Sequence, residues 1–312
     1  MSEPKPEPPM SVGGQAVLEG VMMRAPGAWA IAVRRPDGVI EAVRHELPRL
    51  SSRSKVATIP FLRGIMVLGE SLTLGYRALT WSAQKVAGED EEELSRGEIA
   101  FSMGIALVVF VGLFIMVPAL VAGWLAGDSR IAFATIDAAL MLVIFIGYLW
   151  LIGRSKEIRR VFQYHGAEHM SIHAFEAGEP LSVDSVARYR PEHPRCGTNF
   201  LMIVILLSIT VFSFVGKPDW PLLVASRIIG IPLIAGLSYE VLKFAGARQS
   251  DRVGRFMAAP GMWLQKLTTG VPERDMIEVA VTSLVSALEP HQVDEVIARG
   301  GVPEAALHAR AV

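Results

Sequence analysis

A histidine-rich segment in the middle of the chain contains the residues best suited to bind a metal ion. From His165 to His173 it reads HGAEHMSIH. If the segment is helical, His165 and His169 are one turn apart, so their imidazoles can converge on one cation. Glu168 neighbours His165 and can act as a base toward metal-bound water. This order of His, two residues, Glu and His is the inverted form of the zincin motif.

Two further segments offer ligands of the same kind. His193 and Cys196 lie three positions apart, just before the third apolar run of the chain. Imidazole together with a soft thiolate suits zinc. Glu240 lies within the fourth apolar run, where a carboxylate is costly unless it is paired, protonated or bound to a cation. It is a candidate third ligand, or a partner for Arg227 or Lys243.

These residues predict a site for a divalent metal, with zinc favoured by the thiol. The predicted ligands are His165, His169, His193, Cys196 and Glu240. Glu168 is the predicted general base. Four protein ligands would close a tetrahedral shell and mean a structural site, whereas three would leave a position for water and mean catalysis. Two simpler interpretations stay open, namely a titratable surface stripe of histidines and a cysteine that is only a small buried hydrophobe.

The apolar segments predict the class of fold. The 312 residues are 51% hydrophobic with a formal net charge of −1, which is too apolar for an ordinary soluble domain. Four uncharged or sparsely charged runs are long enough to cross a hydrocarbon core of roughly 30 Å. They occupy residues 101–125, 131–152, 200–215 and 222–245. We expect two transmembrane hairpins, 101–152 and 199–246, in a mainly α-helical integral membrane protein.

The distribution of basic residues predicts the orientation in the bilayer. The links within the two hairpins, 126–130 and 216–221, carry one basic residue each, whereas the middle link, 153–198, carries seven. Basic residues concentrate in cytoplasmic loops. We therefore expect both termini and the middle link, with its histidines, on the cytosolic side of the cell membrane.

The N-terminal region predicts a small sheet followed by an amphipathic helix. Within 11–58, residues 29–35 and 38–45 alternate as half-buried strands do, and 15–24 is a candidate third strand of an antiparallel sheet. Residues 59–87 place polar residues seven apart, which draws one polar seam down a helix. We expect this helix to lie on the cytosolic bilayer surface. A fifth membrane crossing is the alternative.

The remaining segments are polar. Residues 1–10 predict a disordered tail, 88–100 an acidic linker, and 247–312 cytosolic helices followed by a loose tail. A single cysteine excludes an intrachain disulfide. The chain has no basic stripe interleaved with aromatic residues, so nucleic acid is not an expected partner.

With these residues identified, the chain resembles the YqhQ-like family of bacterial multi-pass membrane proteins, a family of unassigned function labelled as predicted metal-dependent enzymes. The resemblance runs from Val12 to about Leu288. It is carried by the segments Gly13–Arg24, Phe162–His169, His193–Thr198, Ser238–Glu240 and Pro260–Thr269. It implies that the predicted ligands and Glu168 belong to the family pattern, as do Gln15, Glu19 and Arg24. Met170 departs from it, because a lysine is usual there.

Three functions are compatible with these features. The leading hypothesis is a zinc-dependent hydrolase that acts at the cytosolic face of the membrane on a membrane peptide or a lipid-like substrate. The second is a non-enzymatic membrane scaffold or regulator with a structural metal site. A solute transporter ranks last, because the first three apolar runs offer few polar groups to line a path.

Overall fold

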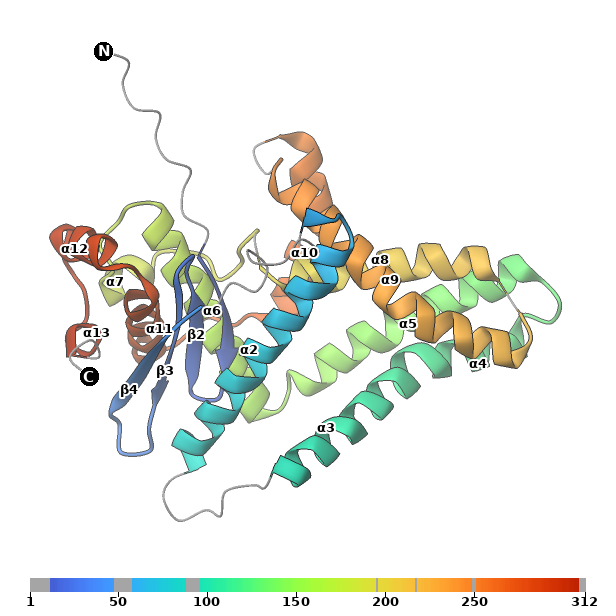
Figure 1. Cartoon of the computed structure of the whole chain (residues 1–312), viewed down its shortest axis with the longest axis horizontal. Coiled ribbons are helices and arrows are strands. Elements are labelled where there is room, and N and C mark those ends of the chain that lie inside the picture. Colours follow the sequence, from blue (N-terminus) through green and yellow to red (C-terminus); the bar gives the residue numbers. More distant parts are fainter. Residues whose placement is uncertain are drawn as a thin grey trace.

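The computed structural model describes residues 12–47, 58–87, 96–194, 196–216, 218–248 and 251–308. The chain forms an elongated bundle of apolar helices and a body of strands and helices at one end of it (Figure 1). The predicted tail at 1–10 and the acidic stretch at 88–95 lie outside the described residues, as does Arg195. Residues 96–100, which were predicted as linker, instead form the first turn of a helix.

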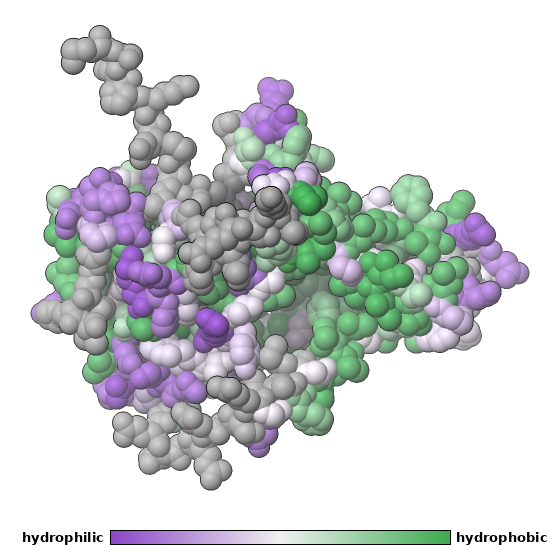
Figure 2. All heavy atoms as spheres, viewed as in Figure 1, coloured by the Kyte–Doolittle hydropathy of each residue, from purple (hydrophilic) through white to green (hydrophobic). Residues whose placement is uncertain are grey.

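The bundle confirms the four predicted apolar helices. Its elements are α3 (Arg96–Val111), the π-helical segment η2 (Gly112–Met116), α4 (Val117–Leu125), α5 (Arg130–Ile152), α8 (Thr198–Val215) and α9 (Trp220–Gly246). Four helices within the described residues are long and apolar enough to cross a membrane. Figure 2 shows hydrophobic side chains along the flank of this bundle and a hydrophilic patch at its far tip. This distribution matches an apolar belt between two polar surfaces.

A buried ion pair joins two helices of the bundle. Arg227 on α9 donates to Asp137 on α5 over 2.7 Å, and the Phe212 ring lies 3.9 Å from the guanidinium carbon. Both charged side chains are almost fully buried. Arg227 is therefore not the partner of Glu240 that the sequence suggested.

The sheet has four antiparallel strands in the order β1-β2-β3-β4. They are β1 (Gly13–Val17), β2 (Gly20–Arg24), β3 (Ala28–Arg34) and β4 (Ile40–Glu46). The predicted third strand at 15–24 was wrong in its boundaries, because this stretch folds as a hairpin. Its two-residue turn, Leu18-Glu19, contains no glycine or asparagine that would signal it, and Glu19 adopts a positive φ of 49°.

Helices cover both faces of the sheet. On one face lies α2 (Leu62–Ala87), whose Leu74 and Ala78 pack against Trp29 and Ile31. The other face is covered by α6 (Lys156–Glu176) and α11 (Arg274–Ala287). Figure 1 shows the sheet between these layers. The N-terminal region, the middle link and the C-terminal region thus share one core, whereas the sequence suggested three separate regions.

The first turns of α2 also pack on α9, so this helix connects the sheet to the bundle. It is not one of the four helices in the described residues with the apolarity of a membrane span, and its predicted place on the bilayer surface stays a prediction. The first half of its polar seam contacts other parts of the protein, because Arg63 pairs with Glu240 and Glu70 lies 3.8 Å from Arg24, whereas Arg77 and Gln84 are exposed. The remaining helices are α7 (Val183–Val186), α10 (Arg252–Thr268), α12 (Pro290–Arg299) and α13 (Glu304–His308).

Candidate metal centre

The histidine-rich segment is helical, as predicted, and forms most of α6. Ser155 caps this helix by accepting from the Ile158 N–H, and Glu157 adds a favourable negative charge to the first turn. The regular helix places His165 and His169 one turn apart, with ring centroids separated by 4.4 Å. Their ring nitrogens can therefore face one point.

Cys196 completes a group of three converging ligands. It lies just before α8, and its Sγ is 3.2 Å from the Nε2 of His165. One ligand atom from each of His165, His169 and Cys196 lies within 4.8 Å of the other two. Zinc binds nitrogen and sulfur at roughly 2.0–2.3 Å. A zinc ion would therefore fit between these three atoms after a small contraction.

The hydrogen bonds behind the two imidazoles orient their ligand atoms. The Nδ1 of His165 lies 2.8 Å from the Thr268 carbonyl oxygen, and the Nδ1 of His169 lies 2.5 Å from that of Pro191. A carbonyl oxygen only accepts, so each Nδ1 carries the proton and each Nε2 keeps its lone pair. Metal-binding histidines use their second nitrogen in this way.

The Nε2 of His169 is the atom that most needs a cation. Within the part of the chain that the structure describes, it is buried and has no hydrogen-bond partner. Burial, reinforced by the neighbouring histidines, lowers the pKa of His169 to about 2. The imidazole is therefore neutral at cellular pH, with a buried acceptor that no described residue satisfies. Leaving such an acceptor unpaired costs roughly 1–3 kcal/mol.

The environment of the Cys196 thiol also suits a metal ligand. Burial raises its pKa, whereas hydrogen bonds from the Thr198 hydroxyl and backbone N–H oppose that effect. These two donors lie 3.2 and 3.4 Å from the sulfur. They come from the first turn of α8, where unpaired N–H groups favour a thiolate. A cation that replaced the thiol proton would thus leave a stabilised sulfur ligand.

Glu168 lies beside the three ligands on the inner side of α6. Glu168 is only 4% exposed. Its carboxylate accepts a hydrogen bond from the Gly14 N–H. Within the described chain its Oε2 has no hydrogen-bond partner. Burial raises the pKa of Glu168 to about 8, while His165 and the Gly14 N–H lower it and Cys196 raises it. The carboxyl therefore interacts electrostatically with His165 and Cys196. A pKa near neutral pH suits a group that accepts and donates a proton.

Comparison with known proteins agrees with the resemblance of the motifs. Residues 59–290 match the family described as "Protein of unknown function (DUF1385)". The chain belongs to the DUF1385 family. It is also 32% identical over 302 residues to "Uncharacterized protein YqhQ" of Bacillus subtilis (strain 168), covering 92% of this chain and 95% of that protein. No solved structure matches the chain.

In this DUF1385 protein, His193 lies next to the three ligands but faces away from them. Its ring centroid is 5.7 Å from that of His169, and its Nε2 lies 3.5 Å from a carboxylate oxygen of Glu176. The Gln265 side chain makes two hydrogen bonds to the His193 backbone. It accepts from the His193 N–H at 2.7 Å and donates to the His193 carbonyl oxygen at 2.9 Å. Burial lowers the pKa of His193 to about 4. In this arrangement His193 lies outside the group of three converging ligand atoms.

Glu240 is not part of the centre. Its carboxylate accepts from the Phe61 N–H at 3.0 Å and from the Arg63 Nε at 2.8 Å, and a second ion pair joins it to the same guanidinium. The third-ligand role suggested for Glu240 is thus not supported, because α2 supplies the cation that its carboxylate requires. Arg63 is the first residue of the polar seam, so its need for a partner was visible in the sequence.

Several supporting residues have no signal in the sequence. Carbonyl groups such as those of Thr268 and Pro191 leave no residue-type signature, and nothing marks Gln265 as their neighbour. The need for glycine at position 14 is explained only by the folded structure. A Cβ there would lie 2.5 Å from the Met22 carbonyl oxygen and 2.9 Å from the Glu168 Cδ. Only glycine lets strand β1 approach the carboxyl so closely.

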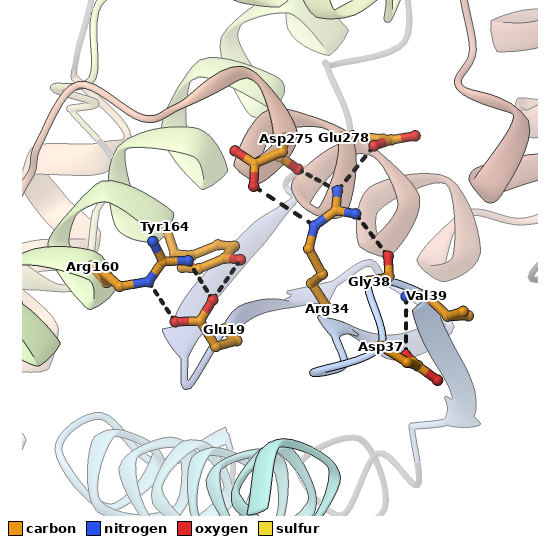
Figure 3. Close-up of polar contacts among 9 residues, drawn as sticks. All are labelled: Glu19, Arg34, Asp37, Gly38, Val39, Arg160, Tyr164, Asp275 and Glu278. Carbon is orange, nitrogen blue, oxygen red and sulfur yellow. Dashed lines mark hydrogen bonds and ion pairs between the residues drawn. The ribbon is translucent and has the colours of Figure 1, made fainter. Parts of the chain in front are cut away.

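A charged clamp fixes the rotation of α6 against the sheet (Figure 3). Arg160 donates to both carboxylate oxygens of Glu19, at 2.6 and 2.5 Å, and the Tyr164 hydroxyl lies 3.3 Å from the same carboxylate. Nearby, Arg34 bonds Glu278 at 3.0 Å and so ties β3 to α11. Arg160 precedes His165 by little more than one turn, so this ion pair holds α6 to the β1–β2 turn close to the histidines.

Proposed function

We propose that this protein binds one divalent ion, zinc, through His165, His169 and Cys196 and uses it to hydrolyse a substrate at the cytosolic face of the membrane. The supporting observation is the convergence of two Nε2 atoms and one thiol within 4.8 Å, with both Nδ1 atoms committed to carbonyl oxygens. Surface histidines would not need oriented tautomers or an unsatisfied buried acceptor.

Hydrolysis is favoured over a purely structural site by the number of ligands. Three protein ligands leave one tetrahedral position for water, and zinc lowers the pKa of a bound water to roughly 7. Glu168 supplies a carboxylate beside that position. A structural site would need a fourth protein ligand. His193, which the sequence offered for that place, is directed toward Glu176.

A structural clip is the second candidate. Its ligands come from α6 in the body and from the segment that leads into α8 of the bundle, so an ion would join the two parts. This role predicts that removal of the ion unfolds the junction. A catalytic role predicts that the junction survives, because α10 already connects it through Gln265 and Thr268.

Metal content tests the site directly. The wild-type protein, purified in detergent and dialysed against zinc, should contain one ion per chain by mass spectrometry. His169→Ala and Cys196→Ala should each lose at least nine-tenths of it. His291→Ala is the matched control, because this histidine is exposed on α12. Full zinc content in both ligand variants would exclude the proposed centre.

The location of the centre is part of the proposal. The link that contains it carries most of the basic residues between the apolar helices, which favours the cytosolic side. Cysteines introduced at Ser129, in the first short hairpin link, and at Ser182, in the middle link, should react with an impermeant maleimide on opposite sides of membrane vesicles. Reaction of Ser182→Cys in intact cells would reverse the proposed orientation.

A further inference from the structure

The strand nearest the candidate centre is an edge strand. β1 pairs with β2, and no other strand in the described part of the chain pairs with its outer side. The hairpin closes at the pair Val17 and Gly20. In an antiparallel ladder the direction of the backbone groups alternates along the strand. Gly14 and Ala16 therefore direct their N–H and C=O groups toward the outer edge.

This edge borders Glu168. The Gly14 N–H bonds the Glu168 carboxylate, and a Cβ at position 14 would lie 2.9 Å from the carboxyl carbon. The same carboxyl interacts electrostatically with His165 and Cys196. Glu168 thus borders the strand edge and directly precedes His169, one of the three proposed metal ligands.

The Gly14 N–H is taken by Glu168, so the groups that this edge offers to a second backbone are the Gly14 carbonyl and the N–H and carbonyl of Ala16. Gly13, Gly14 and Gln15 are exposed, and the two glycines carry no side chain that would keep another strand away. Glycine within a strand often marks such a close approach. Exposed edges normally carry charges or prolines that prevent pairing. Residues 13–17 contain neither.

We propose that the substrate is an extended peptide segment, which pairs with the outer edge of β1 as an additional strand and presents an amide bond to Glu168. This inference rests on the proposed hydrolytic function. Strand addition recognises a peptide through its alternating N–H and C=O groups. A lipid ester offers no such row of groups and would gain nothing from the edge.

The reaction consumes one water and needs no other reactant. Glu168 accepts a proton from the attacking water as the new C–O bond forms at the amide carbon. The same carboxyl then delivers that proton to the amide nitrogen as the C–N bond breaks. The products are a new carboxylate and a new amine.

A proline in the edge strand gives a sharp test. Ala16→Pro removes an outward N–H that the sheet does not use, so the sheet can tolerate it. Ala42→Pro is the matched control, because Ala42 directs its N–H outward on β4, the opposite edge, and both alanines pack on the same core. Zinc content and melting temperature of each variant serve as the check on folding.

The assay offers two substrate classes to the zinc-loaded protein in nanodiscs. One is a library of ten-residue peptides, read by mass spectrometry for new termini, and the other is the phospholipid of the nanodisc, read for released fatty acid. We expect peptide cleavage by the wild type and by Ala42→Pro, and at least a tenfold lower rate for Ala16→Pro at unchanged zinc content.

The outcomes separate the two proposals. Release of fatty acid without peptide cleavage would overturn the peptide inference and leave the hydrolase intact, as would equal cleavage by the two proline variants. Hydrolysis of neither substrate would overturn the proposed function and this inference with it. If Ala16→Pro does not fold, the test uses the wild-type protein and two methylated versions of a peptide that it cleaves. One version carries N-methyl groups on the odd-numbered amides and the other on the even-numbered amides. We expect only one version to be cleaved, and cleavage of both would contradict strand pairing.

Discussion

The Nε2 of His165 lies 3.2 Å from the Sγ of Cys196, although one residue belongs to a helix of the body and the other precedes a helix of the bundle. Each side chain also has its own support, the Thr268 carbonyl for the imidazole and Thr198 for the sulfur. Because the supports come from different elements, the pair depends on how the body and the bundle are packed together. A cation between these atoms would stabilise that packing.

Zinc should therefore raise the thermal stability of the wild-type protein. A ligand present at 100 times its dissociation constant stabilises the folded state by about 2.7 kcal/mol. We expect a higher melting temperature with zinc than with a chelator, measured by differential scanning fluorimetry in detergent. Cys196→Ala should show no shift, and His291→Ala the full wild-type shift. An equal shift in Cys196→Ala would mean that zinc acts elsewhere.

The buried carboxyl of Glu168 should make the metal-free protein sensitive to pH. Folding raises the pKa of Glu168 from the ordinary 4.5 to about 8, so the folded protein keeps a proton that the unfolded chain releases. The contribution of Glu168 to the free energy of unfolding is fully present below about pH 4.5 and is lost as the pH rises to 8. At about 1.4 kcal/mol per pKa unit, the loss is on the order of a few kcal/mol.

Glu168→Gln should remove that dependence. We expect its melting temperature in chelator to fall less than that of the wild type between pH 5 and pH 8. Glu295→Gln on the exposed side of α12 is the control and should follow the wild type. Parallel curves for Glu168→Gln and the wild type would show that the carboxyl is not buried.

Gly14 should be far less tolerant of a methyl group than its neighbour Gly13. A Cβ at position 14 would meet the Met22 carbonyl oxygen at 2.5 Å and the Glu168 Cδ at 2.9 Å, whereas nothing lies within 4 Å of a Cβ at position 13. We expect Gly14→Ala to destabilise the protein by about 1–3 kcal/mol, the usual cost of overpacking. It should also displace Glu168 and so slow hydrolysis. Gly13→Ala should be close to wild type in melting temperature, and similar losses for both would refute this packing.

The sequence predicted those features that depend on local pattern. Uncharged runs of about twenty residues predict the apolar helices, because a helix satisfies its backbone groups within one segment. Spacing alone places His165 and His169 on one side of α6. The nearness of His165 and Cys196 could be proposed from chemistry alone. The direction of His193 and the partner of Glu240 could not, because both depend on α2, α10 and α6 meeting in three dimensions. The Leu18-Glu19 turn has no local signal, because it contains neither glycine nor asparagine, and the contact of Glu19 with Arg160 joins residues far apart in the chain.

Glu240 gives the last prediction, because the sequence and the structure assign it different roles. If its carboxylate serves Arg63 and the Phe61 N–H, Glu240→Ala should keep one zinc per chain and lose thermal stability. Arg63→Ala should lower the melting temperature in the same way. The double variant should lose less than the sum of the two single losses, since both remove one interaction. Loss of zinc from Glu240→Ala at an unchanged melting temperature would restore Glu240 as a ligand.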